Sequence, residues 1–137
     1  MLRVTAAVTM LTATIAATPG GLTTASGVYT ESQAVSGART YAERCAMCHG
    51  GALEGTYETP GLTGKFVANW SSAPLSDLYD YIGRAMPQPA PGTLTPGETA
   101  EVVAYLLKAN GMPAGARPLA ADNAALRQIA FVPVRAR

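Results

Sequence analysis

The only two cysteines and the only histidine of this 137-residue chain stand together, as Cys45, Cys48 and His49. A disulfide across so short a loop would restrict the unfolded chain little and would therefore add little stability to the fold. A structural zinc site needs about four protein ligands, and the chain offers three from cysteine and histidine. A thioredoxin-like dithiol needs a strand–helix–strand context, which the sequence pattern lacks. The cysteine pair therefore requires another explanation.

Two cysteines at this spacing, followed directly by histidine, form the attachment pattern of c-type haem. Residues three apart lie on one face of a helix, so both thiols can reach the two vinyl groups on one edge of a porphyrin. The motif predicts one covalently bound haem c, held by thioether bonds from Cys45 and Cys48. It also predicts that His49, the next residue, is an axial ligand of the iron.

The second axial ligand cannot be another histidine of the same subunit, because His49 is the only one. The other methionines lie near the N-terminus or inside the attachment motif, which leaves Met86 and Met112. Met86 begins a proline-rich stretch between two expected helices, where a rigid strap can cross the distal face of a haem. Met112 follows the last expected helix, where methionine more often serves packing. We expect Met86 to be the ligand and keep Met112 as the alternative.

The first segment has the pattern of a secretory signal, predicted over residues 1–25. It carries one basic residue, a mildly apolar stretch over residues 4–17 and small residues thereafter. Cleavage is expected after Ala25, with Ala16 or Ala17 as alternative sites. The apolar stretch is too short to span a bilayer comfortably, which disfavours an uncleaved anchor. The sequence therefore predicts a periplasmic protein with no stable membrane span after cleavage.

Apolar residues recur at intervals of three and four in several segments, which predicts helices separated by turn-rich loops. The second expected helix is capped by Ser76, and the third begins with a capping box from Thr95 to Glu98. No strand alternation is present, so the fold class is all-α. The expected helices span residues 36–48, 76–85 and 96–110, with shorter helical turns at 65–70 and within 120–129.

A single domain is predicted over residues 36–116. An extended lead-in over residues 26–35 should precede it, and a tail over 117–137 should pack on the domain or trail from it. The formal net charge is only +1 and basic residues are scattered, so the chain lacks the basic stripe of a nucleic-acid-binding protein. It also lacks a nucleophile–base pair, which argues against an enzyme.

The sequence resembles the small monohaem cytochromes c of bacteria, especially those that accept electrons from quinoprotein (PQQ-dependent) dehydrogenases. The resemblance covers about residues 36–116 and implies a small cytochrome c fold, with three to five helices and long loops wrapped around one haem. Besides the attachment motif, it rests on Pro60-Gly61-Leu62-Thr63-Gly64, Phe66, Trp70, residues 78–82, Met86-Pro87, Pro91-Gly92-Thr93-Leu94, residues 104–107 and Asn110-Gly111.

The resemblance also implies roles for residues outside the attachment motif. The carbonyl of Pro60 should accept a hydrogen bond from the ring N–H of His49 and fix its tautomer. Tyr57 and Trp70 are expected to hydrogen-bond haem propionates, although core packing explains both equally well.

A close helix crossing is a further implication of the resemblance. Gly37 and Tyr41 on the first helix should cross the last helix near Tyr105 and Leu106. Gly37 would let the two backbones approach, and the two tyrosines would be core aromatics.

The function implied is one-electron transfer in the periplasm by a haem with His/Met ligation. A quinoprotein dehydrogenase is the expected donor, and a terminal oxidase or another cytochrome the expected acceptor. Two alternatives remain: a five-coordinate haem c protein that binds small gases or peroxide, and an integral cytochrome subunit of a dehydrogenase complex.

Overall fold

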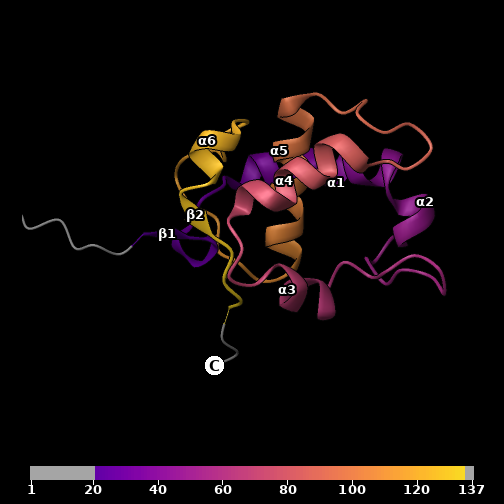
Figure 1. The fold of residues 1–137 in the computed structure, drawn as a ribbon, viewed down its shortest axis with the longest axis horizontal. Helices are drawn as coiled ribbons and strands as arrows, with labels where there is room; N and C mark the ends of the chain where they lie inside the picture. The colour runs from indigo at the N-terminus through magenta and orange to yellow at the C-terminus, as the bar shows by residue number, and fades with distance from the viewer. Residues whose placement is uncertain (1–20, 135–137) are drawn as a thin grey trace, which may run out of the picture.

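The computed structural model describes residues 21–134, and these are mainly helical (Figure 1). The α-helices are α1 (Glu31–Arg44), α2 (Ala46–His49), α3 (Lys65–Trp70), α4 (Leu75–Ala85), α5 (Pro96–Ala109) and α6 (Asn123–Leu126). The remaining elements are β1 (Leu22–Thr23), the short 3-10 helix η1 (Thr24–Ser26) and β2 (Ile129–Ala130). The predicted all-α class is confirmed. The described residues contain six α-helices where three to five were expected, and two of the six, α2 and α6, have only four residues each. Within the described residues, no helix is long and apolar enough to cross a membrane.

The centre of the fold is the crossing of α1 and α5, which share the most extensive contact between helices. Gly37 is buried in this crossing, and a Cβ atom there would collide with the backbone carbonyl of Glu101. One turn further along α1, the ring of Tyr41 lies 5.1 Å from that of Tyr105. The expected crossing near Gly37 and Tyr105 is therefore present.

The second layer of the core is formed by α4, which packs against both α5 and α6. The sequence predicts an apolar face of Leu78, Tyr81 and Ile82; Leu78 and Ile82 are buried as expected, but Tyr81 is exposed and Leu75 takes its place in the buried face. The start of α5 is the predicted capping box. The Glu98 N–H donates to Thr95 Oγ1 (3.2 Å), and the Thr95 N–H donates to the Glu98 carboxylate (2.8 Å).

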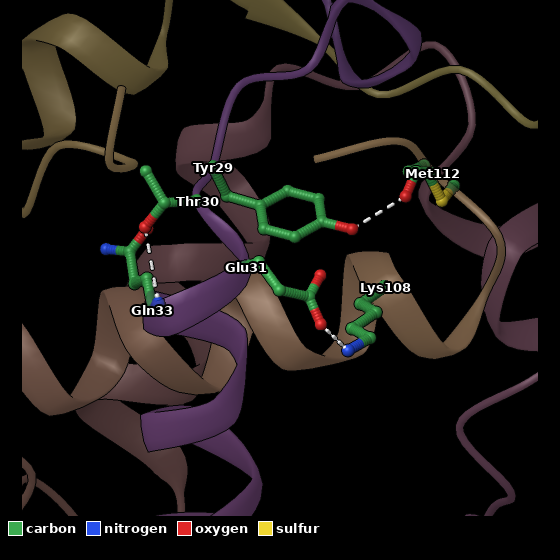
Figure 2. Close-up of polar contacts among 6 residues, drawn as sticks. All are labelled: Tyr29, Thr30, Glu31, Gln33, Lys108 and Met112. Carbon is green, nitrogen blue, oxygen red and sulfur yellow. Dashed lines mark hydrogen bonds and ion pairs between the residues drawn. The ribbon is translucent and has the colours of Figure 1, made fainter. Parts of the chain in front are cut away.

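The first helix differs from its predicted bounds at both ends. It begins at Glu31 instead of residue 36, because Thr30 is its N-cap and accepts a hydrogen bond from the Gln33 N–H (3.2 Å; Figure 2). Glu31 also forms an ion pair with Lys108, which links the first turn of α1 to α5 (Figure 2). The expected extended conformation over 26–35 is therefore wrong from Glu31 onward. At the other end, the backbone bends at Cys45 and divides the expected helix into α1 and α2.

The start of α4 also differs from expectation. Its N-cap is Pro74, and Ser76 is buried inside the first turn instead of capping it. The carbonyl of Pro74 accepts from the Asp77 N–H (3.0 Å), so backbone geometry begins the helix without a side-chain cap. A proline carbonyl can supply this bond although its nitrogen has no hydrogen to donate.

The C-terminal tail packs on the domain. Leu119, Leu126 and Phe131 are buried, and β2 pairs with β1 in a two-stranded parallel sheet that the sequence pattern did not predict. This sheet lies at the opposite end of the molecule from α2 (Figure 1). Most of the predicted signal peptide, residues 1–20, lies outside the described residues. Residues 22–25, however, belong to β1 and η1.

Candidate functional site

The attachment motif lies in one tight turn where α1 ends and α2 begins. Cys45 is the C-cap of α1 and the N-cap of α2, with φ −127° and ψ −35°. Its carbonyl accepts from the N–H groups of Cys48 (3.1 Å) and His49 (3.0 Å). All three residues of the motif are thus fixed relative to one another by local backbone hydrogen bonds.

Cys45 and Cys48 form no disulfide in the part of the chain that the structure describes. Cys45 is half-buried and packs against the hydrophobic core, and burial raises the pKa of its thiol. Cys48 and the neighbouring Met47 are exposed. The pair therefore presents one thiol at the edge of the core and one at the surface.

The His49 ring is held in one orientation by the chain itself. Its Nδ1 lies 2.9 Å from the carbonyl oxygen of Pro60, the contact expected from the sequence resemblance. A carbonyl only accepts hydrogen bonds, so this contact assigns the ring proton to Nδ1. In the neutral ring, the lone pair that can bind a metal ion is then on Nε2.

The loop that carries Pro60 is tied to the body of the fold. The Leu62 N–H donates to the carbonyl of Leu53 (2.9 Å), and the carbonyl of Leu62 accepts from the side-chain amide of Asn110 (3.0 Å). The same amide donates to the carbonyl of Leu106 at the end of α5 (2.8 Å). The sequence reasoning assigned no role to Asn110, although an asparagine at a helix C-terminus is a recognisable end signal.

Tyr41 supports the residue that follows the histidine. Its hydroxyl donates to the carbonyl of Gly50 (2.6 Å), and burial raises its pKa to about 12. Gly50 has a positive φ of 81°, and a side chain there would press against the carboxylate of Glu54. The sequence reasoning predicted Tyr41 as a core aromatic and missed this hydrogen bond, because the acceptor is a backbone atom.

The two candidate methionines occupy different environments. Met112 is buried at 2% exposure, and its carbonyl accepts from the hydroxyl of Tyr29 (2.7 Å; Figure 2). Met86 is half-buried, directly follows α4 and packs against the edge of the core. Met112 therefore has the environment of a packing residue, which is the role that its position after the last helix favours.

The loop that follows Met86 is fastened to the attachment helix. Arg44, the last residue of α1, donates from its guanidinium to Thr93 Oγ1 (2.6 Å). Thr93 Oγ1 in turn donates to the carbonyl of Ala90 (2.8 Å) within the same loop. This contact links the segment beside Cys45 to the loop that begins at Met86. Sequence reasoning missed it, since the two residues lie far apart in the chain.

Tyr57 and Trp70 lie in unlike surroundings. The side chain of Tyr57 is fully exposed, whereas Trp70 is half-buried between Phe66 (ring centroids 6.5 Å apart) and Tyr81 (5.8 Å). Within residues 21–134, neither side chain makes a hydrogen bond to another residue. Their assignment to haem propionates remains a prediction.

The donor set suits a c-type haem. It offers two thiols three residues apart, an imidazole whose Nδ1 contacts the Pro60 carbonyl so that Nε2 faces away from that bond, and a thioether in Met86. Groups of these kinds attach haem c and ligate its iron in cytochromes c. The partly buried apolar side chains that pack against the core include Cys45 between α1 and α2, Ala46 in α2, Leu62 after Pro60, Val67 and Trp70 in α3, and Met86 directly after α4.

Comparison with known proteins points in the same direction. The family model described as cytochrome c oxidase, cbb3-type, subunit III matches residues 32–106, which is more than half of the chain. The sulfane dehydrogenase SoxCD of Paracoccus pantotrophus has a similar fold, with a TM-score of 0.52 and 22% identity over 86% of this chain and 68% of that one. No curated protein matches. The chain therefore belongs to the family of that cbb3-type subunit III model and is a c-type cytochrome, a class that carries covalently bound haem c.

Proposed function

We propose that this protein is an exported one-electron carrier with a single haem c, attached through Cys45 and Cys48 and ligated by His49 and Met86. The observation that carries the proposal is the attachment turn. It holds both cysteines beside a histidine whose Nδ1 contacts the Pro60 carbonyl. The half-buried position of Met86, and the core position of Met112, support the choice between the two methionines.

When bound, a haem with two protein ligands supplies one-electron transfer between Fe(II) and Fe(III). The chain contributes rigidity around it. Pro60 orients the ring of His49, and Asn110 holds the Pro60 loop against α5. Arg44 fastens the loop that begins at Met86. These contacts come from separate parts of the chain, so both proposed ligands are held by tertiary structure.

The proposed setting is the periplasm, with redox proteins as partners. The donor is a dehydrogenase: the sequence resemblance favours a quinoprotein dehydrogenase, while the structural relative is named a sulfane dehydrogenase. The name of that relative also favours the alternative that this chain is an integral cytochrome subunit of a dehydrogenase complex. The acceptor is a terminal oxidase or another cytochrome. Reduction rates measured with each purified dehydrogenase, and gel filtration of the native protein, distinguish a mobile carrier from a stable subunit.

Attachment is tested by replacing Cys45 and Cys48 together with alanine. The double variant should carry no covalent haem on a denaturing gel stained for haem, whereas the parent protein should stain. A double variant that still stains contradicts the attachment proposal.

Ligation is tested by comparing Met86→Ala with Met112→Leu. Leucine is used at Met112 because this side chain is buried, and a change of similar volume keeps the packing cost below about 1.5 kcal/mol. Met86→Ala should abolish the long-wavelength sulfur-to-iron absorption band of the oxidised protein and lower the reduction potential, because a thioether favours Fe(II). The band should survive in Met112→Leu. The reverse pattern makes Met112 the ligand, and a parent protein without the band favours a five-coordinate haem that binds gases or peroxide.

A further inference from the structure

Thr24 belongs to the buried structure, although it lies within the predicted signal peptide. Its exposure is 0%, and its hydroxyl both donates to the carbonyl of Val132 (2.9 Å) and accepts from the Val132 N–H (2.9 Å). One side chain thus satisfies both backbone groups of a residue 108 positions away. A buried hydroxyl placed in this way replaces one step of a β-ladder.

The residues around Thr24 extend the same contact. On one side, β1 pairs with β2 in parallel register, with Leu22 opposite Ile129 and Thr23 opposite Ala130. On the other side, the Gly115 N–H donates to the carbonyl of Tyr29 (2.6 Å). The segment from residue 22 to residue 29 therefore contacts the chain after α5 at two separate places, once at Gly115 and once in the C-terminal tail.

The tail segment that Thr24 holds is itself part of the core. Phe131 is 1% exposed and packs edge-to-face on Phe66, with ring centroids 6.4 Å apart. Its N–H donates to the carbonyl of Ala73 (2.9 Å), and its carbonyl accepts from the Ser72 N–H (2.9 Å). The tail is thus a middle layer between residues 22–24 and the segment that leads into α4.

Cleavage after Ala25 would remove β1 and Thr24 together. The backbone groups of Val132 would lose their partner, and the pairing opposite Ile129 and Ala130 would be lost. The hydrogen bonds between residues 22–24 and 129–132 can stabilise the mature protein only if cleavage leaves residues 22–24 in place.

From this geometry we propose that the leader is removed upstream of Leu22, so that the mature cytochrome keeps residues 22–26 as a structural clasp on its C-terminal tail. The step is hydrolysis of one peptide bond by a leader peptidase, with one water molecule consumed. The sequence offers Ala16 and Ala17 as small residues suited to such a site, and both lie outside the described residues. The inference rests on the export in the proposed function.

The first experiment is the intact mass of the haem-loaded protein purified from the periplasmic fraction, with sequencing of its N-terminus. We expect an N-terminus between Ala17 and Leu22. An N-terminus at Ser26 overturns the clasp while export stands. A retained Met1 overturns export, and with it the proposed cleavage.

The second experiment compares Thr24→Val with Thr23→Val in the full chain. Valine keeps the shape of threonine but leaves both Val132 groups without a partner at position 24, whereas the Thr23 hydroxyl contacts only the exposed Ser26 side chain. Thr24→Val should raise the unfolding equilibrium constant about tenfold to a hundredfold relative to Thr23→Val, as expected for unsatisfied buried groups. Equal unfolding constants for the two variants overturn the clasp even where the N-terminus is as expected.

Discussion

Replacing Gly37 with alanine tests the crossing of α1 and α5. The new methyl group would collide with the carbonyl oxygen of Glu101 and approach Cβ of Tyr105 to 3.0 Å. The carbonyl belongs to the α5 backbone and cannot rotate away, so the two helices have to separate. Such overpacking costs roughly 1–3 kcal/mol in a well-packed core, and a collision with backbone belongs at the upper end.

Alanine also has an advantage in a helix, which has to be subtracted. It is favoured over glycine by about 1 kcal/mol in a helix interior. The net loss expected for Gly37→Ala is therefore about 2 kcal/mol, the difference between the upper overpacking cost and this gain.

Gly83→Ala is the matched control. Gly83 lies in α4, and a Cβ there would make ordinary contacts at 3.6 Å with the Thr99 side chain. This change should therefore show the helix gain alone, up to about 1 kcal/mol. The two variants should differ by about 3 kcal/mol, measured by urea unfolding of the holoprotein and followed by circular dichroism. If Gly37→Ala is as stable as Gly83→Ala, the close approach of α1 and α5 is not as described.

Two further predictions concern groups with shifted pKa values. The pKa of Glu98 is lowered from 4.5 because its carboxylate accepts from the Thr95 backbone N–H and hydroxyl; this stabilisation is present above pH 4.5 and is lost as pH falls through the lower folded value. Glu98→Gln should flatten the dependence of urea unfolding on pH below 4.5, and an unchanged dependence contradicts this. Tyr41→Phe removes the hydrogen bond to Gly50 and should cost about 1 kcal/mol at neutral pH. The folded pKa of Tyr41 is raised from 10.0 to about 12. The stability that the neutral hydroxyl contributes is therefore complete below pH 10 and is lost as pH rises through 12. The phenylalanine variant should not show this loss.

The features that could be read from the sequence are those set by neighbouring residues. The attachment motif is contained in five residues, and its turn is closed by hydrogen bonds to the Cys45 carbonyl. The capping box from Thr95 to Glu98 likewise needs only one turn of helix, and it was predicted with the correct residues. The all-α class followed from apolar periodicity, which a helix imposes along its own length.

Where an element began was less predictable. The start of α1 is capped by Thr30, and its first residue, Glu31, also pairs with Lys108, which lies in another helix. Ser76 has the residue type of a cap, yet the tertiary fold places it inside the first turn of α4 and buries it. Local preference is weak enough for packing to move a boundary by several residues.

Long-range contacts were decided by the tertiary structure alone. The bond from Asn110 to Leu62, the bond from Arg44 to Thr93 and the pairing of Thr24 with Val132 each join residues separated by 48 positions or more. Two of these partners, Leu62 and Val132, take part through backbone atoms, which every residue possesses and which therefore leave no pattern in the sequence. The motif identified which residues could hold a haem, whereas only the folded chain determined which contacts orient His49, fasten the loop at Met86 and make residues 22–26 part of the domain.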